Sequence, residues 1–509
     1  DGHIRLGGAA GTDENQDLYV KSAAQLTLLG NDSDLDNSYT GAAIKAGVSN
    51  VASVTAHGAA TDSNWQHIAF GVNNSEKMRI TKDGSLQFPD AVIITPAANK
   101  PTRIGYNAGS DTQGSYAIAI GELAGQSGQN AHGVAIGYAS GKDGQNTYSV
   151  AIGLQAGESN QDFSATAVGH DAGRSHQGKY ATAIGVAAGN SSQSDYAVAI
   201  GVNAGRLSQG SSTVAIGNDS GQSTQGLVAV AGGSQAGKTS QESYSTAVGF
   251  QAGMDSQGSY ATALGQAAGA YTQNAYSIAI GTAAGFYGQH RSAVAMGASA
   301  GQNNQGSYAV ALGNLAGVNT QNNYAIAIGH QSGISGQYLG SVAIGVDSGY
   351  HSQNTYSVAV GSAAGCSGQY QYAVAVGVNA GRSHQGDSGV AIGNTAGYDR
   401  QGTASVAIGV NAGNYIQAEK CVAIGDGAAW YGQNVYAVAI GLDAGRDGQK
   451  EVAIAIGSNA GGRNQSDRAV AIGDYAGYCQ QGIRAVGVGN SAGRTSQGDA
   501  TTAVGDAAG

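Results

Sequence analysis

Alanine and larger residues alternate in a short segment that recurs through most of this chain. In Tyr196-Ala-Val-Ala-Ile200 and Tyr308-Ala-Val-Ala-Leu312, alanine occupies every second place, and tyrosine or branched residues fill the others. Because the side chains of a β-strand point alternately to its two faces, this period of two predicts a strand. We expect the branched face to fill a core, and the alanine face to let another backbone or sheet approach closely.

The same segment returns every sixteen residues. A glycine follows it at Gly105, Gly121, Gly137 and onward to Gly505, giving 26 glycines without insertion or deletion. A period held this strictly predicts that each unit is one coil of a repetitive scaffold. We therefore predict an all-β protein, with a β-roll or β-solenoid of 26 sixteen-residue repeats over residues 101–509 that is truncated partway through a repeat.

Two glycines mark the corners of each predicted coil. The second lies four residues after the first in 25 of the 26 units, and Ala429 replaces it once. Glycine is the residue type that tolerates positive φ, so fixed glycines predict corners of fixed backbone shape. The corners of the first regular coils are predicted at Gly121, Gly125, Gly137, Gly141, Gly153 and Gly157.

A glutamine follows the first glycine by eight residues in all 25 units that reach this position. A solvated loop has no need of one particular amide at every turn. Coils of a solenoid stack at about 4.8 Å, so these amides are predicted to form a hydrogen-bonded ladder worth about 0.5–1.5 kcal/mol per bond. Its representative members are Gln113, Gln129, Gln145, Gln289, Gln305 and Gln321.

Residues 1 to about 100 lack the period, and all three prolines, Pro89, Pro96 and Pro101, lie near the boundary at their end. Short alternating segments at 18–21, 25–29 and 67–72 are predicted strands. Residues 75–86 are predicted as two strands joined by a turn at Asp83-Gly84. We therefore predict a separate β-rich N-terminal module, with a role in attachment or in a collar.

A sixteen-residue coil spans at most about 53 Å around its path and encloses few large apolar side chains. One chain alone would be thin, which predicts a homo-oligomer. Stacked at about 4.8 Å, the coils would form a rod on the order of 120 Å long.

Composition and charge exclude several classes of function. The formal net charge is −10 and the 23 lysines and arginines form no cluster, so nucleic-acid binding is not expected. No apolar run approaches the roughly 20 residues of a membrane-spanning helix. Cys366, Cys421 and Cys479 are more than fifty residues apart and predict no disulfide framework.

Units such as Val134-Ala-Ile-Gly-x-x-Ser-Gly141 and Val150-Ala-Ile-Gly-x-x-Ala-Gly157 resemble the head repeats of trimeric autotransporter adhesins. Similar repeats occur in tail fibres of tailed bacteriophages, and Glu76-Lys-Met-Arg-Ile-Thr-Lys-Asp-Gly84 looks like a segment of such fibre proteins. The resemblance implies a left-handed, homotrimeric β-roll with one repeat per coil. The sixteen-residue period is longer than that usual in adhesin heads, and their neck, stalk and barrel anchor are not seen.

Candidate catalytic and metal-binding groups are sparse. Only Glu451 and Asp467 place acids at one phase in consecutive repeats, where a carboxylate pair could act on a glycan; Lys450, Arg468 and Arg484 lie beside them, and a solvated edge is the simpler interpretation. No histidines recur sixteen residues apart, which leaves a metal ladder within one chain unsupported. We predict no enzyme activity, no cofactor and no metal site.

The positions after the second glycine vary most, and several hold aromatic residues. Exposed aromatic side chains can stack on sugars or anchor another protein, whereas packing against a neighbouring chain is the simpler alternative. Trp430 follows Ala429, the one break in the glycine pattern. The predicted contact residues are Phe286, Tyr287, Trp430 and Tyr431.

These features predict a structural fibre shaft, most simply that of a phage tail fibre, located in the virion and extending toward the host surface. Its expected partners are copies of itself, other virion proteins and a host glycan or protein. The alternative is the passenger of a trimeric adhesin on a bacterial cell surface, which binds matrix or glycan directly. A glycan-cleaving tailspike is the third hypothesis.

Overall fold

The computed structural model describes residues 52–57, 67–72, 75–81, 86–87, 99 and 101–509. The chain divides into two compact units, residues 1–95 and 96–509, which are described separately. Every regular element in the described residues is a β-strand. None of these residues forms a helix long and apolar enough to cross a membrane.

The first unit contains an antiparallel sheet in the order β1-β2-β3-β4. Its strands are β1 (Ala52–His57), β2 (His67–Val72), β3 (Ser75–Thr81) and β4 (Leu86–Gln87). The predicted strand at 67–72 and the predicted strand pair within 75–86 are therefore confirmed. The predicted strands at 18–21 and 25–29, and the turn at Asp83-Gly84, lie outside the described residues.

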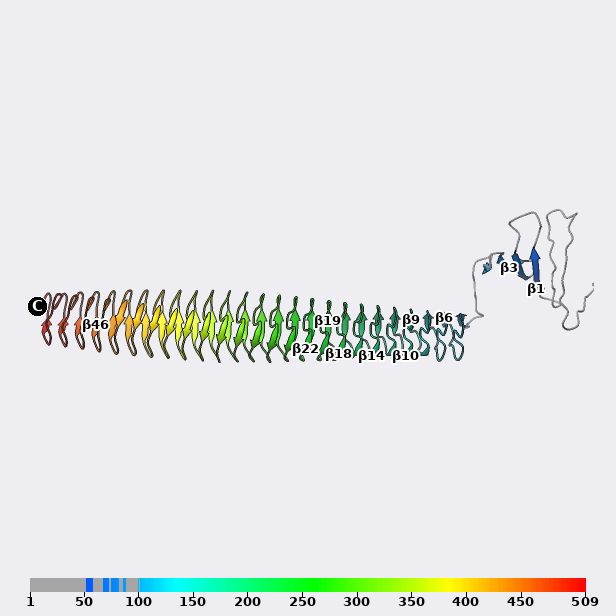
Figure 1. The fold of residues 1–509 in the computed structure, drawn as a ribbon, viewed down its shortest axis with the longest axis horizontal. Helices are drawn as coiled ribbons and strands as arrows, with labels where there is room; N and C mark the ends of the chain where they lie inside the picture. The colour runs from blue at the N-terminus through cyan, green and yellow to red at the C-terminus, as the bar shows by residue number, and fades with distance from the viewer. Residues whose placement is uncertain (1–51, 58–66, 73–74, 82–85, 88–98, 100) are drawn as a thin grey trace, which may run out of the picture. The chain divides into compact units, whose positions relative to one another are not determined.

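The second unit is a parallel β-solenoid of about 25 coils, which confirms the predicted all-β class and the sixteen-residue coil (Figure 1). One sheet, here called the first sheet, contains 26 three-residue strands that begin every sixteen residues. They run from β5 (Thr102–Ile104), β6 (Ile118–Ile120), β7 (Val134–Ile136) and β9 (Val150–Ile152) to β49 (Thr502–Val504). The second sheet contains strands from β8 (Asp143–Gln145) and β10 (Ser159–Gln161) to β44 (Tyr431–Gln433), again every sixteen residues.

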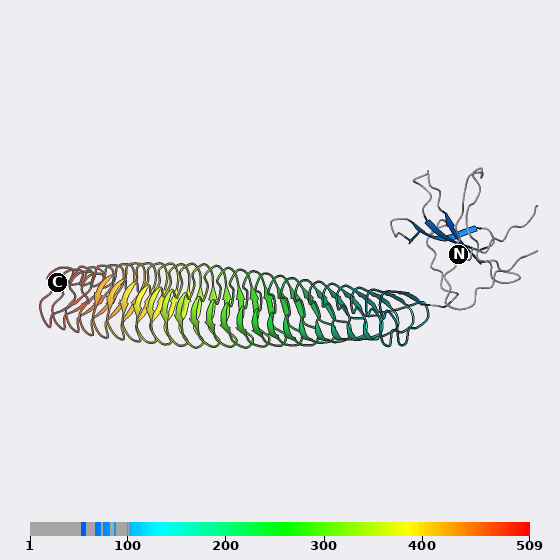
Figure 2. The same ribbon diagram turned by 45° about the vertical axis from the view of Figure 1, so that its right-hand side comes forward.

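Each strand pairs in parallel with the equivalent strand of the coils before and after it. In the first sheet Ala135 pairs with Ala119 on one side and with Ala151 on the other. The same register of sixteen residues holds to the pair of Val488 with Val504. Figure 2 shows both sheets running along the stack of coils. Equivalent residues of successive coils therefore form straight columns.

Two tight turns close each coil. One follows the first corner glycine, where the amide of Ala124 donates to the carbonyl of Gly121 at 3.3 Å. The other precedes the strand of the first sheet, where the amide of Ser149 donates to the carbonyl of Asn146 at 3.3 Å. These bonds are the i to i+3 bonds of β-turns.

Both corner glycines have the backbone shape that their residue type suggests. Gly121 has φ of 123° and Gly125 has φ of 53°. A Cβ atom built on Gly121 would lie 2.6 Å from the carbonyl oxygen of Gly137 in the next coil. The short contact with the next coil and the positive φ thus both exclude a side chain at the first corner glycine.

Non-glycine residues also take positive φ at three places in most coils, which the sequence did not lead us to expect. Tyr148, Gln155 and Asn160 have φ of 62°, 53° and 54°. The amide of Gln155 donates to the carbonyl of Tyr138 in the preceding coil, whereas that of Gly157 donates to Ala172 in the next one. The residues with positive φ thus let some backbone amides donate to the preceding coil and others to the next one. These hydrogen bonds offset the cost of the left-handed conformation, about 1 kcal/mol per residue.

The prediction that the branched face fills the core is wrong for the single chain. The alanines at the centre of each strand are fully buried, as are those before the second glycine, such as Ala151 and Ala156. The branched residues of the same strands are half-buried, and Ile200 and Ile216 remain 37% and 45% exposed. The two sheets lie so close that only methyl groups and one flat amide per coil fit between them.

The tyrosine that precedes the alternating segment was predicted to belong to the strand, and this is also wrong. Tyr308 has φ of 61° and is 48% exposed, and the strand β29 (Val310–Leu312) begins two residues later. The turn between Gly306 and Ala309 directs the tyrosine outward. The alternation of alanine with larger residues therefore begins two residues before the strand does.

Candidate functional site

The glutamines form one continuous ladder through the interior of the solenoid. Nε2 of Gln305 donates to Oε1 of Gln321 at 3.1 Å, and Oε1 of Gln305 accepts from Gln289 at the same distance. Nε2 also lies 2.8 Å from the carbonyl oxygen of Val294 and 3.3 Å from that of Ala309. Gln305 is fully buried. Each amide thus joins its own coil to both neighbours.

The same bonds hold the other glutamines singled out from the sequence. Gln113 donates to Gln129 at 2.8 Å, and Gln129 donates to Gln145 at 2.9 Å. The first of them, Gln113, is only part-buried and also accepts from Nε of Arg103 at 2.6 Å. The ladder is therefore structural, and its donors are engaged within the chain.

The second corner glycine makes room for the glutamine. A Cβ atom on Gly141 would lie 2.7 Å from Oε1 of Gln145. Ala429 takes this place once, with φ of 49°, and Gln433 still donates to Gln449 at 3.0 Å. One methyl group at this corner is thus accommodated without loss of the ladder.

The acidic pair Glu451 and Asp467 serves the backbone. Oδ1 of Asp467 accepts from the amide of Glu451 at 3.3 Å. The same contact, from an amide to the side chain sixteen residues later, recurs from Lys179 to Asp195 and from Ile483 to Asp499. Within the described residues no ion pair joins either acid to Lys450, Arg468 or Arg484. This recurrence indicates that the carboxylate caps a turn amide that makes no backbone hydrogen bond between coils.

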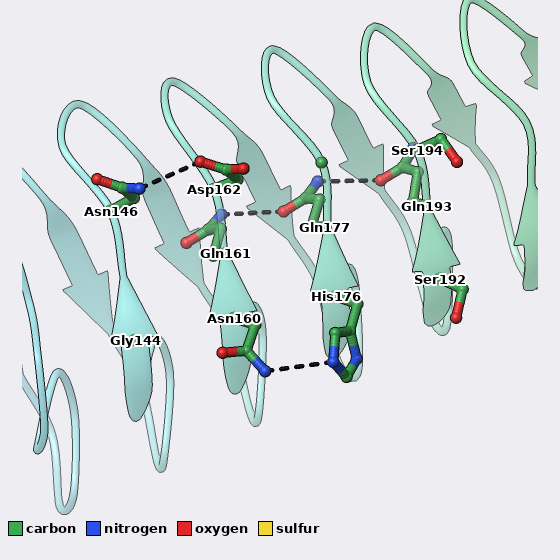
Figure 3. Close-up of a pocket in the computed structure, with 11 residues that line it drawn as sticks. Gly144, Asn146, Asn160, Gln161, Asp162, His176, Gln177, Ser192, Gln193 and Ser194 are labelled. Carbon is green, nitrogen blue, oxygen red and sulfur yellow. Dashed lines mark hydrogen bonds between the residues drawn. The ribbon is translucent and has the colours of Figure 1, made fainter.

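A shallow polar groove of about 490 Å³ lies over the second sheet (Figure 3). Two columns of side chains border it, on either side of the glutamines. Nδ2 of Asn146 donates to Oδ1 of Asp162 at 3.1 Å, and Nδ2 of Asn160 lies 3.4 Å from Nε2 of His176. Ser192 and Ser194 continue the columns. The groove offers hydroxyl, amide, imidazole and carboxylate groups.

The predicted contact residues Phe286 and Tyr287 lie in one small aromatic cluster. Tyr271 from the preceding coil stacks on Tyr287 with ring centroids 4.9 Å apart and meets Phe286 edge to face at 5.3 Å. Tyr287 is 48% exposed. Tyr271 completes this cluster and was not predicted from the sequence, although it lies sixteen residues before Tyr287.

Trp430 and Tyr431 belong to a second aromatic cluster, in which the structure also places Tyr415 and Arg446. Tyr415 stacks on Tyr431 at 5.2 Å, and the guanidinium of Arg446 lies 5.1 Å from the Trp430 ring. Tyr431 is 49% exposed. Nε1 of Trp430 and Nε of Arg446 are buried and have no hydrogen-bond partner among the described residues, and the same holds for Oδ1 of Asn414 one coil earlier. In both clusters the exposed tyrosine therefore has one ring face stacked on a tyrosine of the preceding coil.

Two kinds of exposed column were not foreseen as surfaces. The branched stripe consists of the first and third residues of every strand in the first sheet, such as Val310 and Leu312. The tyrosine column consists of Tyr116, His132, Tyr148 and every sixteenth residue to Ala500. In this column Tyr244, Tyr260 and Tyr276 stack with centroids 4.9 Å and 5.1 Å apart. The recurrence of these residues at sixteen-residue spacing could have predicted both columns. The expectation that the branched face points into the core prevented their prediction as surface residues.

The described residues contain no group of three or more histidine, cysteine, aspartate or glutamate side chains that could hold a metal ion. Cys366, Cys421 and Cys479 are all free. Cys421 is fully buried where most coils have alanine or serine, and its Sγ lies 2.8 Å from the carbonyl oxygen of Asn434. It fills a core position.

Burial raises the pKa of Cys421 from 9.0 to about 11. At pH 8 we expect iodoacetamide to alkylate Cys366 and Cys479, which are half-buried, well before Cys421. Unfolding should make all three react alike. The folded state keeps this proton longer than the unfolded chain, so its contribution to stability is full below pH 9 and falls between pH 9 and about 11. Mass spectrometry of tryptic peptides over time measures the labelling, and rapid labelling of Cys421 in the folded chain would contradict this assignment.

Comparison with known proteins gives no further identification: no family profile, curated protein or solved structure matches the chain. The fold and its surfaces define a class, a parallel β-solenoid built of sixteen-residue repeats with an amide ladder at its centre.

Proposed function

We propose that this chain is a rigid, non-enzymatic fibre shaft that works as a homotrimer, and that it forms part of a phage tail fibre extending toward a host surface. The observation that carries the proposal is the branched stripe. It combines a regular rod with a surface of mostly branched apolar residues, interrupted in a few coils by threonines such as Thr166 and Thr182, that one chain leaves partly exposed. The resemblance to fibre and adhesin repeats supplies the trimer and the virion location.

The size of the stripe supports self-association. About 25 coils at about 4.8 Å, and two outward side chains across each strand, make a surface about 120 Å long and roughly 10 Å wide. That is roughly 1,200 Å² per chain, compared with about 800 Å² per partner in a stable protein complex. The largest apolar patch on a typical monomer covers about 300–600 Å². A second and third copy of the chain would bury this surface along its whole length.

Light scattering on the folded chain tests the assembly. We expect a mass of about three times 50.3 kDa, and a mass of 50.3 kDa would overturn the trimer. Immunogold labelling with an antibody to the folded chain tests the location. We expect label on phage tail fibres, and label confined to a bacterial cell surface would favour the adhesin alternative.

Charge on the branched stripe should dissociate the assembly. Three consecutive substitutions, Ile328→Lys, Ile344→Lys and Val360→Lys, place cations at residues that face outward in the single chain. We expect a monomeric mass with an unchanged far-ultraviolet circular dichroism spectrum, because the coil interior is untouched.

The matched control places three lysines on the second sheet, as Asn319→Lys, Ser335→Lys and His351→Lys. This variant should keep the mass of the parent. If both variants kept it, the branched stripe would not be the interface.

A specific observation favours the adhesin as the second candidate. Tyr287 and Tyr431 are the first residues of two strands of the second sheet, β26 (Tyr287–Gln289) and β44 (Tyr431–Gln433), and both lie outside the branched stripe. Their clusters therefore stay accessible when the stripe is covered. A bacterial surface passenger could use them to bind glycan or matrix directly. Binding of the purified chain to a host-derived glycan array, reduced by Tyr431→Ala, would support this candidate.

A further inference from the structure

Two columns border the branched stripe, one on each side. The tyrosine column lies just before the strand of the first sheet. The post-glycine column, which lies just after it, consists of the residues that follow the first corner glycine: Glu122, Tyr138, Leu154 and every sixteenth residue to Asp506. The strand separates the two columns, so in one chain they lie at opposite edges of the stripe.

Charge is segregated by sign between these two edges. The post-glycine column contains four acids and no lysine or arginine, and the tyrosine column contains three lysines or arginines and no acid. All seven charged side chains are exposed. The acids are Glu122, Asp426, Asp474 and Asp506, and the cations are Lys420, Arg468 and Arg484.

Within one chain these opposite charges do not meet. No ion pair in the described part of the chain involves any of the seven residues. Lys420 instead lies 5.2 Å from the ring of Tyr436 and donates to its hydroxyl at 3.3 Å. The strand β43 (Val422–Ile424) lies between Lys420 and Asp426 and keeps them on opposite edges of the stripe.

The heights of these charges along the rod match. Asp426 lies six residues after Lys420, and Asp474 lies six residues after Arg468. Six of the sixteen residues in a coil correspond to about 2 Å of rise. On two rods at the same level, the acid of one would therefore lie beside the cation of the other. Arg484, ten residues after Asp474, would flank the same carboxylate from the next coil.

We propose that copies of this chain associate in parallel and nearly in register, with the post-glycine column of one copy against the tyrosine column of its neighbour. This inference rests on the self-association proposed above. A closed homotrimer is itself parallel and in register, so what the inference adds is the contact residues. An antiparallel pair facing stripe to stripe would place each column against the same column of its partner, so no acid of one column would meet a cation of the other. Parallel copies instead pair Lys420 with Asp426 and Arg468 with Asp474.

The uncharged members of the two columns fit the same arrangement. Val346, Val378 and Val410 of the post-glycine column are 46–47% exposed. Tyr356 and Tyr372 of the tyrosine column are 50% and 53% exposed. Aliphatic side chains on one edge would pack against aromatic rings on the other, and would extend the contact beyond the branched stripe.

Thiol crosslinking of the full chain tests the inference. Cys366→Ser, Cys421→Ala and Cys479→Ser first remove the native thiols. Arg468→Cys with Asp474→Cys then places one thiol on each edge, and a short bis-maleimide reagent should convert most of the protein to covalent oligomers. A bridge within one chain would leave that chain monomeric on a denaturing gel, so only links between chains count as covalent oligomers.

A second double-cysteine variant tests whether the two chains are in register. Arg468→Cys with Asp426→Cys uses the same two edges, but places the thiols more than two coils apart along the rod. This variant should crosslink at least tenfold less than the in-register pair. Equal crosslinking of the two variants, or crosslinking of Asp474→Cys alone, would overturn the parallel in-register contact.

The outcomes separate the two proposals. A monomeric mass for the parent chain would remove the self-association itself. An oligomeric mass without crosslinks at residues 468 and 474 would leave the shaft intact and remove only this edge-to-edge contact. A charge exchange gives a second reading: Asp474→Arg should raise the fraction of dissociated chain at low salt, and the added Arg468→Asp should restore the parental fraction. No restoration would overturn the pairing of these two residues.

Discussion

Replacing Gly313 by alanine is expected to break the solenoid at that coil and to lower the free energy of unfolding by about 3 kcal/mol or more. Gly313 has φ of 128°, which side chains with a Cβ rarely adopt, and the new Cβ would lie 2.6 Å from the carbonyl oxygen of Gly329. The clash is with backbone that is fixed by the next coil, so a rotamer change cannot relieve it. Thermal unfolding and hydrogen exchange on the full chain measure the effect, with loss of protection centred on the coils around residue 313.

Gly232→Ala is the matched control. Gly232 lies in a strand of the first sheet without positive φ, and a Cβ atom there would meet the methyl groups of Val248 at 3.7 and 3.9 Å, which is ordinary contact. We expect no loss of stability from this change. If Gly313→Ala were equally neutral, neither the conformation nor the contact at the first corner glycine would be essential.

Replacing Gln305 by alanine is expected to cost about 2–5 kcal/mol, because the change leaves a cavity and buried polar groups without partners. The acceptor Oε1 of Gln321 and the carbonyl oxygen of Val294 would both lose a donor. Full burial makes this effect larger than the single hydrogen bond considered from sequence alone. Chemical denaturation of the full chain, followed by local hydrogen exchange, measures it.

Gln302→Ala removes an amide of the same size from the same coil. Gln302 is half-buried, and its side chain makes no hydrogen bond with the part of the chain that the structure describes. Its replacement should change stability by less than about 0.5 kcal/mol. Similar effects of the two substitutions would mean that the ladder contributes nothing beyond ordinary packing.

The architecture explains how such a chain would work as a shaft. Each coil contacts only its neighbours, through two parallel sheets and one amide, so stability accumulates along the rod. Unfolding must begin by separating two coils and exposing their backbone and glutamine bonds together. We therefore expect slow unfolding and protease resistance, which suit a fibre that carries load outside a cell.

The sequence alone determined the coil. Strict recurrence of Gly121, Gln129 and Ala135 at sixteen residues predicted a solenoid, its corners and its amide columns, because a period without insertion permits only stacked, equivalent units. Alternation likewise predicted that Ala135 and Ile136 face opposite sides of a strand. These are local properties, and each residue type constrains its own backbone or its nearest copy in the next coil.

Only the tertiary structure decided which side is the interior. Alternation is symmetric between the two faces, and the larger side chains of Val134 and Ile136 suggested a core that the narrow coil has no space for. The closing turn at Asn146 to Ser149 brings the sheets together until only alanine and glutamine fit, which directs the branched residues and Tyr148 outward. The apolar surface of this protein thus follows from how tightly each coil closes. The distance between the two sheets depends on the folded coil, and the alternation of alanine with larger residues does not specify it.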